Sequence, residues 1–199
     1  MRDLDYPLLF TFKITTIAND FEAVDAKGET IAYVREKIFK LKDDVDVYSD
    51  KTKTRRLFNI KANQWIDWST SYKVTTDDGQ SLGRIGRKGW RSIWKATYEI
   101  FDENDQKEFH VQEDNAWVKV GDSLLSEIPL LGMLTGYFFN PGYSVYDNHG
   151  TKVAHIKKMK SFFGRRFKVE QLVNNMAPAQ EERVALGLMM MILLERRRG

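Results

Sequence analysis

Cations interleaved with tryptophan make one segment of this sequence well suited to bind an anion. Between residues 84 and 95 lie Arg84, Arg87, Lys88, Trp90, Arg91 and Lys95. Several cations on a strand and its turn can converge on a phosphate, while a tryptophan suits the boundary of a lipid bilayer. The pattern predicts a site for anionic phospholipid headgroups. The alternative is a solvated strand at a sheet edge, where charge prevents edge-to-edge pairing.

A second basic segment lies nearer the end of the chain. It contains Lys157, Lys158, Lys160, Phe162, Phe163, Arg165 and Arg166. The same chemistry predicts an auxiliary contact with an anionic surface. The alternative is a charged hairpin whose phenylalanines pack inward. The sequence leaves open whether the two basic segments share one face of the protein.

The apolar segment 128–139 offers a different kind of contact. Its candidate interface residues are Leu130, Leu131, Phe138 and Phe139. The segment is shorter than the roughly 20 residues that a membrane-spanning helix needs. It can dip into a membrane interface, bind a protein partner, mediate self-association, or cap the mouth of a barrel. The oligomeric state is left open.

Catalytic chemistry finds little support in the sequence. The histidines, His110, His149 and His155, show no i,i+4 helical spacing that would place two of them on one face. The chain has no cysteine, which excludes disulfides, thiolate ligands and thiol nucleophiles. We therefore expect a protein that is not an enzyme and that needs neither a cofactor nor a metal ion.

Two acidic segments are interpreted as turns. Asp102-x-Asn104-x-Gln106 resembles part of a calcium-binding loop, but Lys107 stands where such a loop requires glycine. This segment is expected to be the tip of a hairpin. The segment 43–46, with three aspartates, is expected to be another exposed turn.

Composition narrows the remaining possibilities. The 199 residues fit one domain, 1–199, and 42% of them are hydrophobic, which is enough for a sizeable core. Lys and Arg number 31 against 28 Asp and Glu, and this thin surplus of +3 makes nucleic acid an unlikely partner. The N-terminus has no apolar signal-peptide region and no apolar run is long enough to span a membrane. We expect a cytoplasmic protein, at most peripheral at a membrane, whose partner is either an anionic membrane surface or another protein.

The elements that must position these residues are mostly strands. From residue 9 to about 120, apolar and polar residues alternate with period two, as in Phe10, Phe12 and Ile14. Turn signals separate the runs at Asp25–Gly28, Asp77–Gly79, Asp102–Asp105 and Asp147–Gly150. We count about twelve strands, most of them joined as hairpins.

Two helical segments interrupt the strand pattern. A lid-like helical insertion is expected at about 122–139, and a second helix at about 180–197. The second has Glu181 and Glu182 in its first turn and arginines in its last, which matches the helix dipole. Because it is apolar all round, it should be buried on all sides.

The order of elements resembles the tubby C-terminal-like superfamily, and two stretches carry the similarity. They are Phe21–Gly28, continuing through Ile31, Val34, Lys37, Phe39 and Leu41, and Ser71–Gly79 followed by Leu82-Gly-Arg-Ile85. They look most like the LURP-one-related branch and are distantly similar to phospholipid scramblases. The resemblance implies a mainly β fold, a closed twelve-stranded antiparallel barrel around a central C-terminal helix. It also implies a non-enzymatic binding or scaffold module, in which basic residues on the barrel surface bind phosphoinositide-like headgroups.

Overall fold

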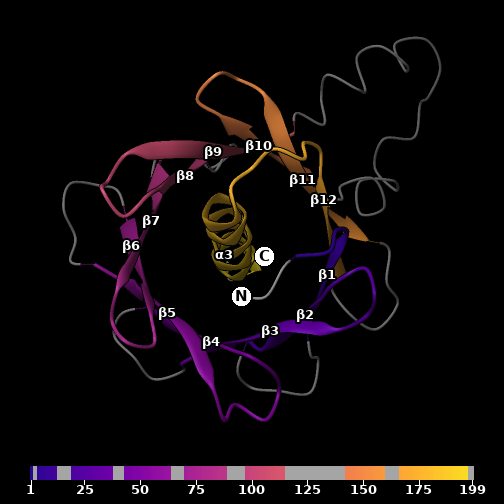
Figure 1. Ribbon diagram of the computed structural model, residues 1–199, viewed down its shortest axis with the longest axis vertical. Coiled ribbons are helices and arrows are strands. Elements are labelled where there is room, and N and C mark those ends of the chain that lie inside the picture. The colour runs from indigo at the N-terminus through magenta and orange to yellow at the C-terminus, as the bar shows by residue number, and fades with distance from the viewer. Residues whose placement is uncertain are drawn as a thin grey trace, which may run out of the picture.

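Twelve antiparallel strands close into a barrel in the computed structural model (Figure 1). The structure describes residues 1, 4–12, 19–37, 43–63, 70–88, 97–114, 142–159 and 166–196. The strands are β1 (Leu8–Phe12), β2 (Phe21–Val24), β3 (Thr30–Glu36), β4 (Asp44–Tyr48), β5 (Arg56–Ala62), β6 (Thr70–Thr76), β7 (Ser81–Lys88), β8 (Thr97–Phe101), β9 (Lys107–Glu113), β10 (Gly142–Asp147), β11 (Lys152–Met159) and β12 (Arg166–Gln171). Each strand pairs with its neighbours in the chain, and β12 closes the ring by pairing with β1.

Tight turns at one end of the barrel explain why consecutive strands pair. In the turn between β2 and β3, the Asp25 carboxylate accepts hydrogen bonds from the backbone N–H groups of Lys27 and Glu29, both at 2.9 Å. Asp102 and Asp147 do the same two and four residues ahead in their own hairpins. The aspartate side chain thus fixes the turn locally, as the turn signals predict.

The two ends of the barrel differ in how the strands are joined. We call the end with the hairpins β2–β3, β4–β5, β6–β7, β8–β9 and β10–β11 the turn end. The opposite end, where β1–β2, β3–β4, β5–β6, β7–β8, β9–β10 and β11–β12 are joined, is the loop end. The insertion expected at 122–139 lies outside the described residues.

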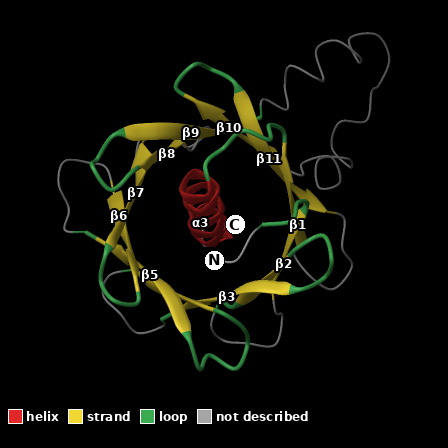
Figure 2. Ribbon diagram, in the orientation of Figure 1, coloured by secondary structure: helices red, strands yellow, loops and turns green. Residues whose placement is uncertain are grey.

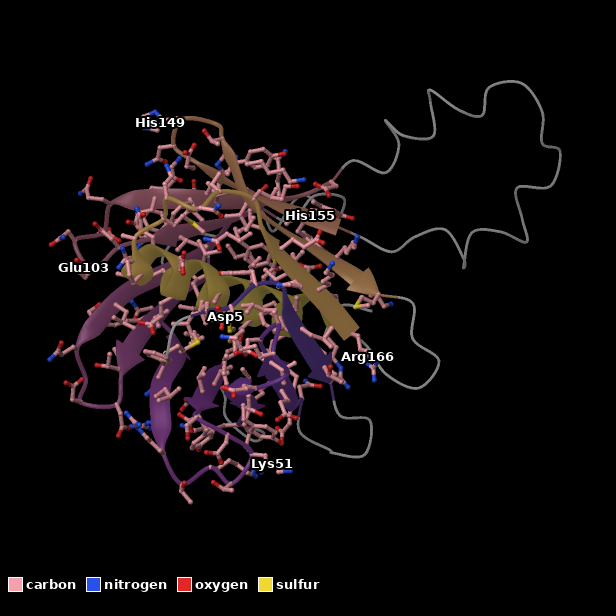
Figure 3. The ribbon with its side chains drawn as sticks, turned by 45° about the vertical axis from the view of Figure 1, so that its right-hand side comes forward. Asp5, Lys51, Glu103, His149, His155 and Arg166 are labelled. Atoms are coloured by element: carbon pink, nitrogen blue, oxygen red, sulfur yellow. The ribbon has the colours of Figure 1, made fainter. Side chains whose placement is uncertain are left out.

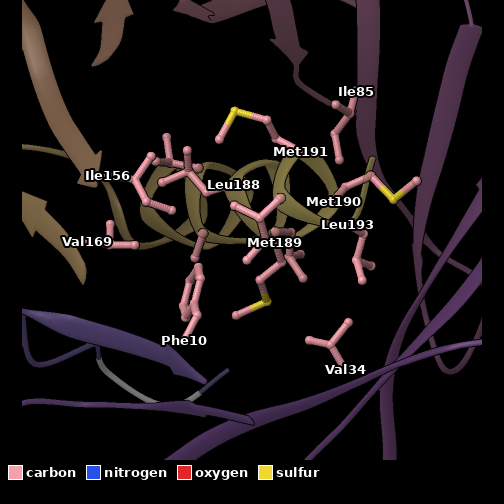
Figure 4. Packing of buried hydrophobic residues seen from close by; sticks show 14 of the residues in the cluster. Phe10, Val34, Ile85, Ile156, Val169, Leu188, Met189, Met190, Met191 and Leu193 are labelled. Carbon is pink, nitrogen blue, oxygen red and sulfur yellow. The ribbon is translucent and has the colours of Figure 1, made fainter. Parts of the chain in front are cut away.

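One helix, α3 (Pro178–Arg196), runs through the centre of the barrel (Figures 1 and 2). Every residue from Arg183 to Leu194 is buried, since all faces of the helix meet the inner wall. Figure 4 shows Met189 on the side that faces Phe10 and Val34. The predicted fold, a closed barrel around a buried C-terminal helix, is confirmed.

The helix approaches the strands most closely at β7 and β8. Gly187 makes this approach possible, because a Cβ atom there would lie 2.6 Å from Cδ1 of Ile100. Larger residues fill other parts of the interior, among them Phe10, Phe12 and Phe21, whose rings contact one another. Unbranched methionines on the helix suit such an uneven space.

A buried ion-pair group anchors the first turns of the helix at the turn end. The Arg183 guanidinium donates two hydrogen bonds to Glu108 on β9, at 2.7 and 2.9 Å, and a third to Glu103 at 3.0 Å. Only 9% of Arg183 is exposed, so its bonds to Glu108 are largely shielded from water, whereas Glu103 is itself half exposed. At the other end of α3, the Arg196 guanidinium lies 4.5 Å from the centre of the Phe12 ring.

Candidate functional site

The two described arginines of the first basic segment lie on opposite sides of β7. The guanidinium of Arg84 lies 3.4 Å from the centre of the Phe101 ring and pairs with Asp105, on the outer wall near the turn end. Arg87 is two residues from Ile85 on β7, so it lies on the same, inward face of the strand as this buried core residue. It is opposite Tyr98 on β8. Its Nε atom is buried without a hydrogen-bond partner. The structure therefore does not bring Arg84 and Arg87 together.

Edge protection does not explain the charges on this strand. Arg87 is in register with Thr70 on β6 and with Tyr98 on β8, so β7 is hydrogen-bonded on both sides. A closed barrel has no free edge to protect. That alternative interpretation is wrong. The side chain of Lys88 and the residues Trp90, Arg91 and Lys95 lie outside the described residues.

The second basic segment begins on the outer wall of β11 and β12. Two rows of three residues face outward and stand in direct register: His155 with Glu170, Lys157 with Lys168, and Met159 with Arg166. We call these six residues the β11–β12 wall; Figure 3 labels His155 and Arg166 on it. Lys157 and Arg166 are exposed, and Met159 is 36% exposed.

The other members of that segment are placed differently or not described. Lys158 alternates with the outward row and lies opposite Phe167, which packs against the core. Lys160, Phe162, Phe163 and Arg165 lie outside the described residues, as do Leu130, Leu131, Phe138 and Phe139.

Electrostatics on the β11–β12 wall are only partly balanced. Lys168 donates a hydrogen bond to Glu170 at 2.6 Å, and this bond holds the pKa of the Glu170 carboxyl below its ordinary value. The Nδ1 atom of His155 lies 4.0 Å from the same carboxylate. Within the described part of the chain, no ion pair includes Lys157 or Arg166.

Beside this wall lies a cluster that sequence reasoning missed. The Asp114 carboxylate accepts a hydrogen bond from the Ser144 hydroxyl. Its other oxygen lies 2.8 Å from Nε2 of His155. Burial raises the pKa of Asp114, but the bonds from Ser144 and His155 outweigh it and hold the pKa below its ordinary value. In a serine nucleophile activated by a base, the histidine contacts the serine directly. Here Asp114 lies between Ser144 and His155, so the cluster does not have that arrangement. Because Asp114 and His155 are 41 residues apart, no spacing in the sequence indicates this contact.

Buried tyrosines fix the end of α3 inside the loop end. The Tyr98 hydroxyl donates a hydrogen bond to Glu195 at 2.5 Å. Burial and then the charge of Glu195 raise the pKa of Tyr98 far above its ordinary value, so the phenol stays protonated. Tyr72 similarly donates to Asp43 at 2.9 Å. The bond from Tyr98 thus ties the end of α3 to β8, as the bonds of Arg183 tie its start to β9.

The acidic segment 43–46 is not the exposed turn that the sequence indicated. Asp44 and Asp46 lie on β4, alternate with inward-facing valines, and are only 7% and 4% exposed. The Lys37 ammonium contacts Asp44 at 3.0 Å and Asp46 at 2.9 Å, and the Asn59 amide bridges both carboxylates. The expectation failed because neighbouring strands supply partners that make acidic residues acceptable in a strand.

The two basic segments lie on separate walls but lead to the same end of the barrel. Three strands, β8, β9 and β10, separate β7 from β11. Both β7 and β11 run toward the loop end, and so does α3. In the sequence, the segments that join strands at the loop end contain nine Lys and Arg and six Asp and Glu. The segments that join strands at the turn end contain four Lys and Arg and eight Asp and Glu.

The described residues contain neither a group arranged as a metal site nor a helix able to span a membrane. No group of three histidine or acidic side chains there is arranged to hold a metal ion. No helix of that part combines the length and apolarity needed to cross a membrane.

Comparison with known proteins adds one finding. A family model described as LURP-one-related matches residues 30–192, which is most of the barrel and nearly all of α3. No curated protein and no solved structure matches the chain.

Proposed function

This chain belongs to the LURP-one-related family, part of the tubby-like superfamily, and from that premise we propose that it is a binding module for anionic phospholipid headgroups. The family is generally non-enzymatic and its membership supports a binding or scaffold role. In this proposal the loop end of the barrel faces the membrane. The protein has no catalytic activity of its own and is peripheral at the cytoplasmic face of a membrane.

The observation that carries the proposal is the difference in charge, in the sequence, between the segments that join strands at the loop end and those that join strands at the turn end. The joining segments have an excess of cations at the loop end and an excess of acids at the turn end. A membrane surface rich in acidic lipids attracts each nearby Lys or Arg by about 1 kcal/mol. A barrel with this polarity is therefore attracted and oriented, even though its net charge is only +3.

Vesicle flotation tests the proposal. The purified chain is mixed with neutral phosphatidylcholine vesicles, and with vesicles that also contain phosphatidylserine or phosphoinositides. We expect binding only to the acidic vesicles, and less of it as salt is raised because salt screens the charges. Substitution of Arg91→Glu with Lys95→Glu, in the segment that joins β7 and β8, should reduce binding.

A matched control uses cations of the turn end. Lys51 and Arg55 are exposed there, so Lys51→Glu with Arg55→Glu makes the same change of net charge at the opposite end. This control should bind like the unchanged chain. Equal binding to neutral and acidic vesicles would overturn the proposal and favour the protein-interaction scaffold, for which Leu130→Ser with Leu131→Ser is the corresponding test.

A further inference from the structure

The pairing of Lys157 with Lys168 is unusual for a barrel wall. The two residues lie directly opposite each other on β11 and β12, and both face outward. Directly opposed side chains in an antiparallel pair have Cβ atoms about 5 Å apart, and like charges at that spacing are destabilising. The fold could relieve this repulsion with any neutral or acidic residue at position 157. The pairing therefore points to an anion that binds both ammonium groups.

The neighbours of this pair offset only part of its charge. Glu170 is the acidic residue of the wall, and it is bonded to Lys168 at 2.6 Å. Arg166 adds a further exposed cation at the loop-end limit of the wall. The wall thus carries three cations and one carboxylate, with Lys157 and Arg166 directed to solvent.

An exposed apolar side chain completes the surface. Met159 lies directly opposite Arg166, at the last residue of β11 before the loop end, and is 36% exposed. The other exposed large hydrophobic residue of the described part is Leu172, which is 49% exposed and follows β12 at the turn end. An apolar side chain among cations matches the boundary of an acidic bilayer, where headgroup phosphates lie just outside the acyl chains.

We infer that the β11–β12 wall is the surface that contacts the bilayer: Lys157, Lys168 and Arg166 bind lipid phosphates and Met159 enters the headgroup region. This inference rests on the proposed function and selects one of the two basic segments as the principal contact. The occupant is an acidic phospholipid surface rather than a soluble phosphate, because a soluble anion would leave Met159 without a role. The barrel then lies tilted toward β11 and β12.

A fluorescence experiment tests the position of Met159. The chain has no cysteine, so Met159→Cys and Leu172→Cys each give a single site for an environment-sensitive dye. The vesicles contain phosphatidylcholine with about 30% phosphatidylserine, which gives a negative surface potential like that of a cytoplasmic leaflet. On these vesicles the emission of the dye at 159 should shift to shorter wavelength and gain intensity. The dye at 172, on the opposite end, should not change.

Charge reversal tests the cations of the wall. Lys157→Glu with Arg166→Glu should weaken partition onto the same vesicles at least tenfold, whereas Lys51→Glu with Arg55→Glu should leave it within twofold. Because Lys157 and Arg166 form no ion pair within the described residues, and Lys157→Glu removes the like charge opposite Lys168, the melting temperature of the variant should be no lower than that of the unchanged chain, which separates lost binding from lost folding.

The outcomes distinguish the two proposals. If the unchanged chain does not bind acidic vesicles, the proposed function fails, and this inference fails with it. If the unchanged chain binds but the dye at 159 stays unshifted and the charge reversal binds within twofold of the unchanged chain, this inference alone is overturned. The membrane contact then lies elsewhere on the loop end.

Discussion

The turn end and the loop end of this barrel differ in how many of their exposed cations have acidic partners. At the turn end, carboxylates of Asp25, Asp102 and Asp147 cap their own hairpins, and Arg183 is bonded to two glutamates. At the loop end, Lys157 and Arg166 reach the surface without an ion pair in the described part of the chain. The charges of the turn end stabilise the fold, and so does Lys37 at the loop end, which is paired with Asp44 and Asp46. We propose that Lys157 and Arg166 instead bind a ligand. Three predictions test this difference, beginning with the largest effect.

Replacing Arg183, which anchors α3 at the turn end, should give the largest loss of unfolding free energy. Arg183→Ala leaves the mostly buried Glu108 carboxylate without its cation, although the Gln180 amide still donates to it, and breaking such an ion pair costs about 3 kcal/mol of unfolding free energy. Chemical denaturation measures this loss directly. The matched control is Lys27→Ala, because Lys27 pairs with Asp5 where both side chains are exposed, and loss of such a pair should change the unfolding free energy little. Equal losses for the two variants would contradict a structural role specific to Arg183.

A smaller, pH-dependent effect is expected at Asp114, beside the β11–β12 wall. Its pKa is lower in the folded protein than in the unfolded chain, so it stabilises the fold above its unfolded value of 3.8. This stabilisation is lost as the pH falls through the lower, folded value. Asp114→Asn should therefore be less stable than the unchanged chain at pH 6, and the difference should shrink below about pH 4. Denaturation of both proteins at a series of pH values measures it; a difference that stays constant to pH 2 would show that the carboxylate charge is irrelevant.

The smallest expected effect is a gain in unfolding free energy, on replacement of Lys157. Lys157→Thr removes the like charge opposite Lys168 and introduces a residue that favours strands. We expect the unfolding free energy to rise by about 0.5 kcal/mol, while binding to acidic vesicles falls. Lys51→Thr at the turn end is the control and should change neither quantity. A loss of stability in Lys157→Thr would mean that Lys157 belongs to the fold rather than to a binding surface.

Most of the fold could be predicted from local patterns. The alternation around Phe10 and Phe12 indicates a strand, the aspartates at the turns indicate hairpins, and the all-apolar stretch before Arg196 indicates a buried helix. The 43–46 segment shows where such patterns fail. Asp44 and Asp46 are partnered by Lys37, which follows β3, and by Asn59 on β5, and no local rule anticipates these contacts.

The candidate site was predicted less completely, because it depends on register. The sequence marked Lys157 and Arg166 as candidates, yet it gave no sign that Lys168 stands opposite Lys157. It also grouped Arg84 with Arg87, although alternation along β7 sends one to the outer wall and the other inward.

The amino-acid sequence by itself determined the strands, their turns and the buried helix, because each follows from residues close together in the chain and from burial of apolar surface. Tertiary structure alone decided which charges meet. Closure of the ring through β1 and β12 removed every strand edge, and the register of β11 with β12 set two lysines face to face. Charges act through distances in space, and in this barrel those distances are set by strand pairing over long separations.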